Sequence, residues 1–186
     1  MSKQLKANLL HALFVGIICG VLIGVYAALP IEVPLYWAAF IMIPTVFMFG
    51  GEWKDVPYHW VNAAIGLFLG GALTFVITQQ LVPGIGLPLA FAVATCICTF
   101  LVQGLTNGVF SPGGFKPFFG RCPMAFVGMI TCFAAGGENY VVALVSLIVG
   151  IVFATLSAQS GKLAARIVGL GQDEPEAAAQ AEGSQA

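Results

Sequence analysis

Two threonine hydroxyls, each flanked by phenylalanines at the same spacing, are the residues in this chain best suited to contact a small solute. The threonines are Thr45 and Thr131, and the flanking rings are Phe40 and Phe47 in the first case, Phe126 and Phe133 in the second. On a helix, residues seven apart lie two turns apart on one face. Hydrophobic constrictions around a weak hydrogen-bonding point pass small neutral solutes and oppose hydrated ions. The six residues therefore predict a pore lining.

These residues belong to a stretch that occurs twice. The segments AFIMIPTVFMFGGE (39–52) and AFVGMITCFAAGGE (125–138) are identical at seven of fourteen positions without a gap. Each contains or follows a proline and ends in a glycine pair, so each is predicted to be a broken helix. Paired broken helices are the sequence sign of a solute site near the bilayer midplane. The predicted helix-breaking residues are Pro44, Gly50, Gly51, Pro123, Gly136 and Gly137.

Other reactive side chains give weaker predictions. Arg121 follows a loop rich in glycine and proline and is a candidate for a cytoplasmic mouth that attracts anions. Cys96 and Cys98 are two residues apart, so a helix places them on different faces and no metal site is predicted. A soft-metal transporter that uses the cysteines is the less favoured alternative. His59 is interpreted as an interfacial residue beside Tyr58 and Trp60.

The composition places the chain in a membrane. It has 186 residues, of which 59% are hydrophobic and 8% charged, whereas soluble domains carry about 25% charged residues. A bilayer crossing needs roughly 20 apolar residues. Six such runs are predicted, at residues 8–29, 34–51, 60–82, 86–106, 117–136 and 139–161. The expected fold is therefore an all-α integral membrane protein with six transmembrane helices.

The positive charges are arranged on one side of such a layout. The seven lysines and arginines are Lys3, Lys6, Lys54, Lys116, Arg121, Lys162 and Arg166. With six spans, all seven fall on the same side as both termini, which the positive-inside rule assigns to the cytoplasm. Residues 1–7 form the cytoplasmic N-terminus, and the acidic, Ala-rich tail 171–186 is predicted to be disordered. A net charge of −1 predicts no nucleic-acid partner.

The repeated stretches lie three spans apart, so their units insert in opposite orientations. Residues 8–82 and 86–161 are predicted to be two inverted three-helix repeats with broken second and fifth helices. Within the spans, no acidic residue, lysine or arginine lies firmly at mid-membrane, which argues against an ion-driven pump. No set of catalytic side chains can meet in one plane, so neither an enzyme nor a cofactor is expected.

Small residues at four-residue spacing predict helix seams. Such residues let helix backbones approach closely in lipid. The glycines concerned are Gly16, Gly20 and Gly24 in the first run, Gly66 and Gly70 in the third, and Gly150 in the sixth. The seams join helices either within one protomer or between protomers, and a homo-oligomer is expected. Asn62, one turn before Gly66, is either a polar contact between helices or part of a pore lining.

A longer run, CPMAFVGMITCFAAGGENYVVALVSLIVGIVFATLSAQSG, together with LYWAAF, resembles a family of small bacterial inner-membrane proteins catalogued only as a domain of unknown function. The features that carry the resemblance are Pro123, Phe126, Gly128, Phe133, Gly150, Ser160 and Gly161. The resemblance implies an inner-membrane location and supplies no substrate. The layout alone is also similar to formate/nitrite channels, whose diagnostic motifs are absent.

These observations predict a passive channel or facilitator for a small neutral solute or weak acid, in contact with the lipid bilayer. The alternative from a different class is a non-transporting scaffold or accessory subunit whose glycine seams dock a partner.

Overall fold

The computed structural model describes residues 1–28, 36–106 and 116–170, and every regular element in these ranges is helical. The predicted disordered tail 171–186 lies outside the described residues. The helices long and apolar enough to cross a membrane are α1 (Lys3–Ala28), a continuous run Trp53–Ile85, α5 (Leu87–Thr106) and α8 (Tyr140–Ile167). Several long apolar helices of this kind are compatible with a multi-pass membrane protein.

The run from Trp53 to Ile85 contains four consecutive pieces: the 3-10 turn η1 (Trp53–Asp55), α3 (Val56–Ile65), the π-helix η2 (Gly66–Ala72) and α4 (Leu73–Ile85). A π-helical turn is wider than an α-helical one and commonly marks a functional or close-packed site. Here Gly66, Gly70 and Gly71 have no side chain, and this lets α7 (Cys122–Ala134) pack closely against η2.

Two shorter apolar helices lie where the sequence predicts the second and fifth spans. They are α2 (Tyr36–Met48) and α7 (Cys122–Ala134), each of 13 residues, and the four-residue α6 (Lys116–Phe119) precedes α7. At 1.5 Å per residue, each short helix extends about 20 Å, against about 30 Å of hydrocarbon. Neither short helix crosses the bilayer without irregular backbone at one of its ends.

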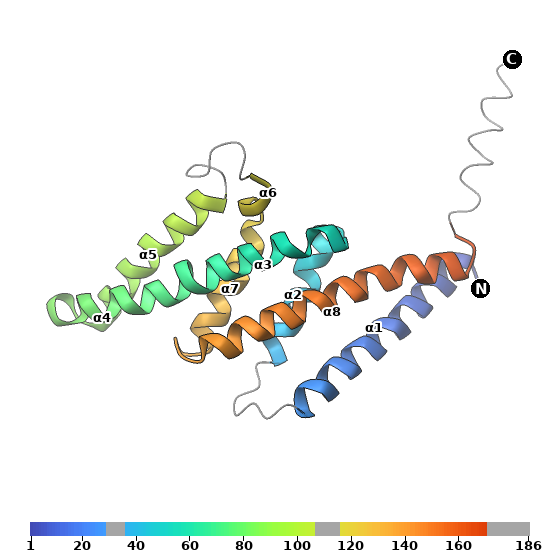
Figure 1. The fold of residues 1–186 in the computed structure, drawn as a ribbon, viewed down its shortest axis with the longest axis horizontal. Helices are drawn as coiled ribbons and strands as arrows, with labels where there is room; N and C mark the ends of the chain where they lie inside the picture. The colour runs from blue at the N-terminus through green and yellow to red at the C-terminus, as the bar shows by residue number, and fades with distance from the viewer. Residues whose placement is uncertain (29–35, 107–115, 171–186) are drawn as a thin grey trace, which may run out of the picture.

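Each short helix packs mainly on one long helix, and α2 also contacts α7. Helix α2 packs on α8, which also pairs with α1, while α7 packs on α3 and η2, and α5 pairs with α4 and η2. Figure 1 shows the resulting order, with α1 and the α4–α5 pair at opposite flanks and the short helices between them.

The two main crossings are close because glycines face alanines. A Cβ atom added to Gly66 would lie 1.6 Å from the carbonyl oxygen of Ala125, and one added to Gly128 would lie 2.0 Å from that of Ala63. In the other crossing, a Cβ on Gly150 would lie 2.6 Å from the Cα of Ala39. Ala39 and Ala125 are the first residues of the two repeated stretches, so matching positions make the two contacts.

Helix α1 differs from these seams. A Cβ atom added to Gly16, Gly20 or Gly24 would have no heavy atom within 4 Å outside its own helix backbone. The α1 glycine stripe (Gly16, Gly20 and Gly24) therefore makes no close contact with another helix among the described residues, whereas Gly66, Gly70 and Gly150 all do.

Candidate functional site

The irregular backbone beyond each short helix is built by a glycine pair. Gly50 and Gly51 follow α2 with φ of +84° and +61°, and Gly136 and Gly137 follow α7 with φ of +69° and +73°. L-residues with a side chain rarely adopt these values, so glycine at these positions ends each helix sharply. Pro44 lies inside α2, whereas Pro123 lies in the first turn of α7, where proline is tolerated.

The two threonines of the predicted pore lining have matching local structure. The hydroxyl of Thr45 donates to the carbonyl of Ile41, and that of Thr131 donates to the carbonyl of Val127, each at 2.8 Å. Both side chains are buried. Because each hydroxyl proton is used within its own helix, only the oxygen lone pairs are left to accept a hydrogen bond from a solute.

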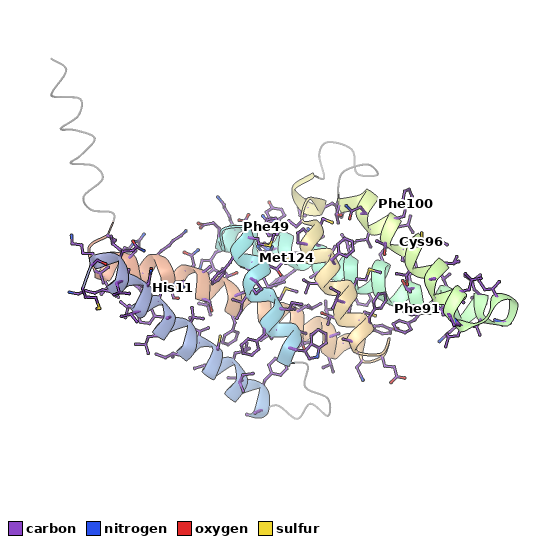
Figure 2. The ribbon with its side chains drawn as sticks, turned by 180° about the vertical axis from the view of Figure 1, so that it is seen from behind. His11, Phe49, Phe91, Cys96, Phe100 and Met124 are labelled. Carbon is purple, nitrogen blue, oxygen red and sulfur yellow. The ribbon has the colours of Figure 1, made fainter. Side chains whose placement is uncertain are left out.

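The four phenylalanines are not gathered around these hydroxyls in one cluster. Phe40 and Phe47 are 37% and 38% exposed, and Phe47 stacks on His11 of α1 at a centroid distance of 6.3 Å. Phe133 contacts Phe91 of α5 at 5.6 Å. Figure 2 shows His11 and Phe91 at opposite ends of the molecule. Phe126 is partly buried on α7.

Phe133 also contacts Phe75 of α4 at 5.9 Å, with the ring planes 77° apart. Phe75 and Phe91 contact each other at 5.8 Å, which completes a three-ring cluster between α4, α5 and α7. A pore lined by all four phenylalanines stays a prediction, and it requires α2 and α7 to present their rings to a shared path.

Arg121, the predicted mouth residue, lies in a compact polar cluster. Its Nη2 atom donates to Oδ1 of Asp55 at 2.7 Å, and the two side chains are only 14% and 15% exposed. Its Nη1 atom lies 3.0 Å from Nε2 and 3.2 Å from Nδ1 of His59. The guanidinium carbon lies 4.9 Å from the centroid of Phe49 and 5.6 Å from that of Tyr58. Arg121 is thus held by a carboxylate, an imidazole and two aromatic faces.

Asn62 fixes the backbone that carries Arg121. Its side-chain amide donates to the carbonyls of Tyr58 at 2.7 Å and Phe118 at 2.5 Å, and its oxygen accepts from the backbone N–H of Arg121 at 3.2 Å. Asn62 is therefore a polar contact between α3 and the α6–α7 junction, which is one of the two roles that the sequence left open.

The Arg121 cluster comprises Asp55, His59, Asn62 and Arg121. Because Asp55 neutralises Arg121, the cluster carries no net charge while His59 is neutral. His59 is fully buried in it, so the structure replaces the predicted interfacial role with a contact to Arg121. The signal in the sequence was the spacing of residues 55, 59 and 62, which a helix places on one face.

A second polar contact ties the end of α8 to the turn after α2. Lys162 pairs with Glu52, and Gln159 donates to the carbonyl of Gly51 at 2.6 Å. The hydrogen bond and charge of Lys162 hold the pKa of Glu52 below its usual range. This contribution to stability is present above the ordinary carboxyl pKa and is lost as the pH falls through the lowered value. It is small, since the two side chains are 50% and 41% exposed.

The cysteines give no support to a metal site. Cys96 is exposed and Cys98 is buried, as their spacing on one helix predicts. In the part of the chain that the structure describes, no group of three His, Cys, Asp or Glu side chains lies close enough to hold a metal ion.

A comparison with protein families shows what the chain is similar to. The model of a family described as a protein of unknown function (DUF1097) matches residues 12–162, a range that extends from α1 into α8. No curated protein and no solved structure matches the chain.

Proposed function

The chain belongs to the DUF1097 family of proteins of unknown function, and we propose that it is a passive channel or facilitator for a small neutral solute or weak acid across the bacterial inner membrane. In this proposal the six apolar helical segments are six spans in two inverted three-helix repeats. The cytoplasmic side is the side that carries the lysines and arginines, and it holds both termini.

The observation that carries the proposal is the pair of short helices at the centre of the bundle. Both α2 and α7 are too short to cross, and both end in glycine pairs with positive φ. Backbone that leaves the helical path at membrane depth is tolerated where it is buried in protein or lines a water-filled path. Both α2 and α7 have such an end, and both pack on another helix through a glycine-alanine contact at matching positions of the repeat. This arrangement favours a solute path between α2 and α7.

The Arg121 cluster supports a neutral solute over a free ion. In this proposal the cluster lies on the cytoplasmic side of the protein. Its guanidinium is neutralised by Asp55 and covered by aromatic rings. A mouth without net charge does not concentrate ions, whereas buried hydroxyl oxygens and rings accommodate neutral molecules. A weak acid would cross in its protonated form.

The proposal is tested by stopped-flow light scattering on proteoliposomes, with urea, glycerol, short aldehydes, acetate and formate as solutes. One solute is expected to equilibrate faster than in empty liposomes. Thr131→Val is expected to slow it about fivefold, because one hydrogen bond is worth about 1 kcal/mol. Phe47→Ala is expected to change the rate by widening the constriction.

The matched control is Phe100→Ala, which removes a ring that is 64% exposed on α5 and is expected to leave the rate unchanged. Rates equal to those of empty liposomes for every solute would rule out a passive channel for this panel.

A second candidate, a scaffold or accessory subunit, is favoured by the unoccupied α1 glycine stripe. Gly20→Leu is expected to convert an oligomer to a monomer in size-exclusion chromatography with light scattering, because the leucine would separate close-packed backbones. Gly84→Leu is the control, since Gly84 also has no atom within 4 Å of its Cβ position. An unchanged mass for Gly20→Leu would remove the stripe from any interface.

A further inference from the structure

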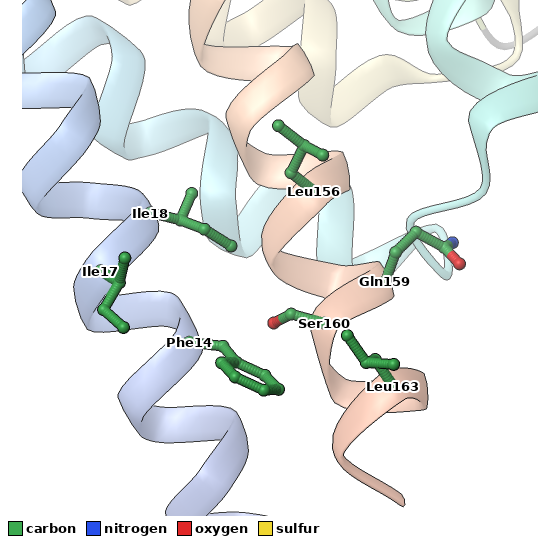
Figure 3. Close-up of a pocket in the computed structure, with 7 residues that line it drawn as sticks. All are labelled: Phe14, Ile17, Ile18, Leu156, Gln159, Ser160 and Leu163. Atoms are coloured by element: carbon green, nitrogen blue, oxygen red, sulfur yellow. The ribbon is translucent and has the colours of Figure 1, made fainter. Parts of the chain in front are cut away.

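A cleft of about 420 Å³ lies between α1 and α8. Figure 3 shows Phe14 and Ile18 of α1 pointing toward α8 across this space, with Ile17 beside them on α1. The wall formed by α8 consists of Leu156, Gln159, Ser160 and Leu163. Five of the seven lining side chains are hydrocarbon, and the two polar ones are engaged: Gln159 donates to Gly51 and Ser160 donates to Ser157. The α1–α8 cleft is therefore a mostly apolar groove between two helices that are long enough to cross a membrane.

One end of this cleft is strongly basic. The helices run antiparallel in a known register, because Nε2 of His11 lies 3.1 Å from the carbonyl oxygen of Ser157 and Gly161 packs against the same ring. In this register the start of α1 lies level with the end of α8, and Figure 1 shows these two ends side by side. Arg166 lies on the same face of α8 as Gln159 and Leu163, because the three residues follow the spacing of helical turns.

Two lysines extend the same end from the other helix. Lys3 lies eleven residues, or about three turns, before Phe14 on the same face of α1, and Lys6 lies one turn after Lys3. Lys6 and Arg166 are exposed. Arg166 lies only about 5 Å beyond Leu163 along the helix axis. The cations thus lie beyond the apolar residues of the groove, at the ends of two helices that are long enough to cross a membrane.

We propose that the α1–α8 cleft binds one anionic phospholipid of the cytoplasmic leaflet, with an acyl chain along Phe14, Ile17 and Leu156 and the phosphate at Lys3, Lys6 and Arg166. Basic pockets between transmembrane helices on the cytoplasmic side recognise anionic headgroups in this way. The groove accommodates the acyl chain, and the cations favour a lipid with an anionic headgroup.

A second copy of the chain fits the cleft less well. A partner related by an axis along the membrane normal has its own Lys3, Lys6 and Arg166 at the same depth, so its cations would face those of the first copy. Like charges at close range destabilise such an interface, whereas an anionic lipid neutralises them. The assignment shares with the proposed function only the orientation that puts both termini in the cytoplasm. It does not depend on solute transport, because it uses neither α2 nor α7.

The test is native mass spectrometry of the full chain in non-ionic detergent, titrated with phosphatidylglycerol or with phosphatidylcholine of identical acyl chains. Phosphatidylglycerol is expected to be retained at a stoichiometry of one per chain. The double variant Lys6→Gln with Arg166→Gln is expected to weaken its retention roughly 10-fold or more, since each cation near the headgroups contributes about 1 kcal/mol. Leu156→Trp is expected to reduce retention by filling the groove.

Two matched controls separate this site from general lipid contact. Lys54→Gln removes a cation that does not line the cleft. Val145→Trp introduces the same ring on α8 at a residue that, like Leu156, is 39% exposed. Both controls are expected to retain phosphatidylglycerol as the parent does, and circular dichroism checks that every variant is folded.

Three results would overturn the proposal. The first is equal retention of the two lipids by the parent. The second is a loss in the Lys54→Gln control as large as that in the double variant. The third is a lipid-free dimer that Leu156→Trp dissociates, which would assign the cleft to a second copy of the chain.

Discussion

Replacing Gly128 by alanine is expected to lower the free energy of unfolding by about 3 kcal/mol. The new methyl group would lie 2.0 Å from the carbonyl oxygen of Ala63 and 2.8 Å from the backbone nitrogen of Leu67. Neither atom belongs to a side chain that can rotate away, so α7 must move off α3 and η2. The loss arises even though alanine favours an isolated helix over glycine by about 1 kcal/mol.

The measurement is denaturant unfolding in detergent micelles followed by circular dichroism, with Gly20→Ala as the control. Gly20 also lies inside an α-helix, but among the described residues no heavy atom lies within 4 Å of its Cβ position. Its replacement is expected to be neutral or stabilising by up to about 1 kcal/mol. Equal losses in the two variants would show that the crossing of α7 with α3 and η2 is not close-packed.

Gly66 contributes to the same crossing from the opposite helix. A Cβ there would lie 1.6 Å from the carbonyl oxygen of Ala125. Once one methyl group has separated the helices, the second meets less resistance. The loss in a Gly66→Ala, Gly128→Ala double variant is therefore expected to be smaller than the sum of the single losses, as for residues that share one contact.

The two kinds of glycine show what sequence can reveal about this bundle. Gly16, Gly20 and Gly24 have the ideal four-residue spacing, yet α1 turns them away from every described neighbour. Gly128 belongs to no such series, yet it makes one of the closest contacts. Spacing identifies a face that permits close approach. Which helix lies on that face depends on contacts between distant parts of the chain, which no local pattern encodes.

The helices themselves were more predictable, because length and hydropathy are local properties. The long apolar helices appear where the runs of about 20 apolar residues occur, and the shorter α2 and α7 appear where proline and glycine pairs interrupt the runs. The bounds differ most at residues 53–59. The sequence treats them as a loop because they contain Lys54 and Asp55, whereas η1 and α3 make them the first turns of a longer helix.

The candidate site was predicted only in part. The sequence indicates Arg121 by its position at the entrance to the fifth predicted span and Asn62 by its place one turn before Gly66 in the third. Their partnership joins residues 59 positions apart, and Arg121 reaches Asp55 across 66 positions. Asp55 and His59 share a helical face with Asn62, but the same spacing also occurs on polar faces that stay exposed to solvent at the end of a span. Only the packing of α7 on α3 buries that face.

Replacing Asp55 by asparagine is expected to cost about 3 kcal/mol of unfolding free energy, because it leaves the Arg121 guanidinium charged in a largely buried site. The exposures of 14% and 15% place this pair near the lower end of the range for buried ion pairs. Adding Arg121→Gln to Asp55→Asn is expected to recover most of the loss, since the double variant buries no uncompensated charge. The four proteins of this cycle give the coupling energy directly.

The Lys162–Glu52 pair is the internal control for this cycle. Its side chains are 50% and 41% exposed, so Glu52→Gln is expected to cost much less unfolding free energy than Asp55→Asn. Equal losses for Asp55→Asn and Glu52→Gln would mean that solvent screens Arg121 and that the cluster does not hold α7 on α3. If the large loss is observed for Asp55→Asn, this variant also tests whether Arg121 lies at the cytoplasmic entrance of a solute path. An unneutralised Arg121 should favour formate and acetate anions over urea in the liposome assay, because the local potential becomes positive.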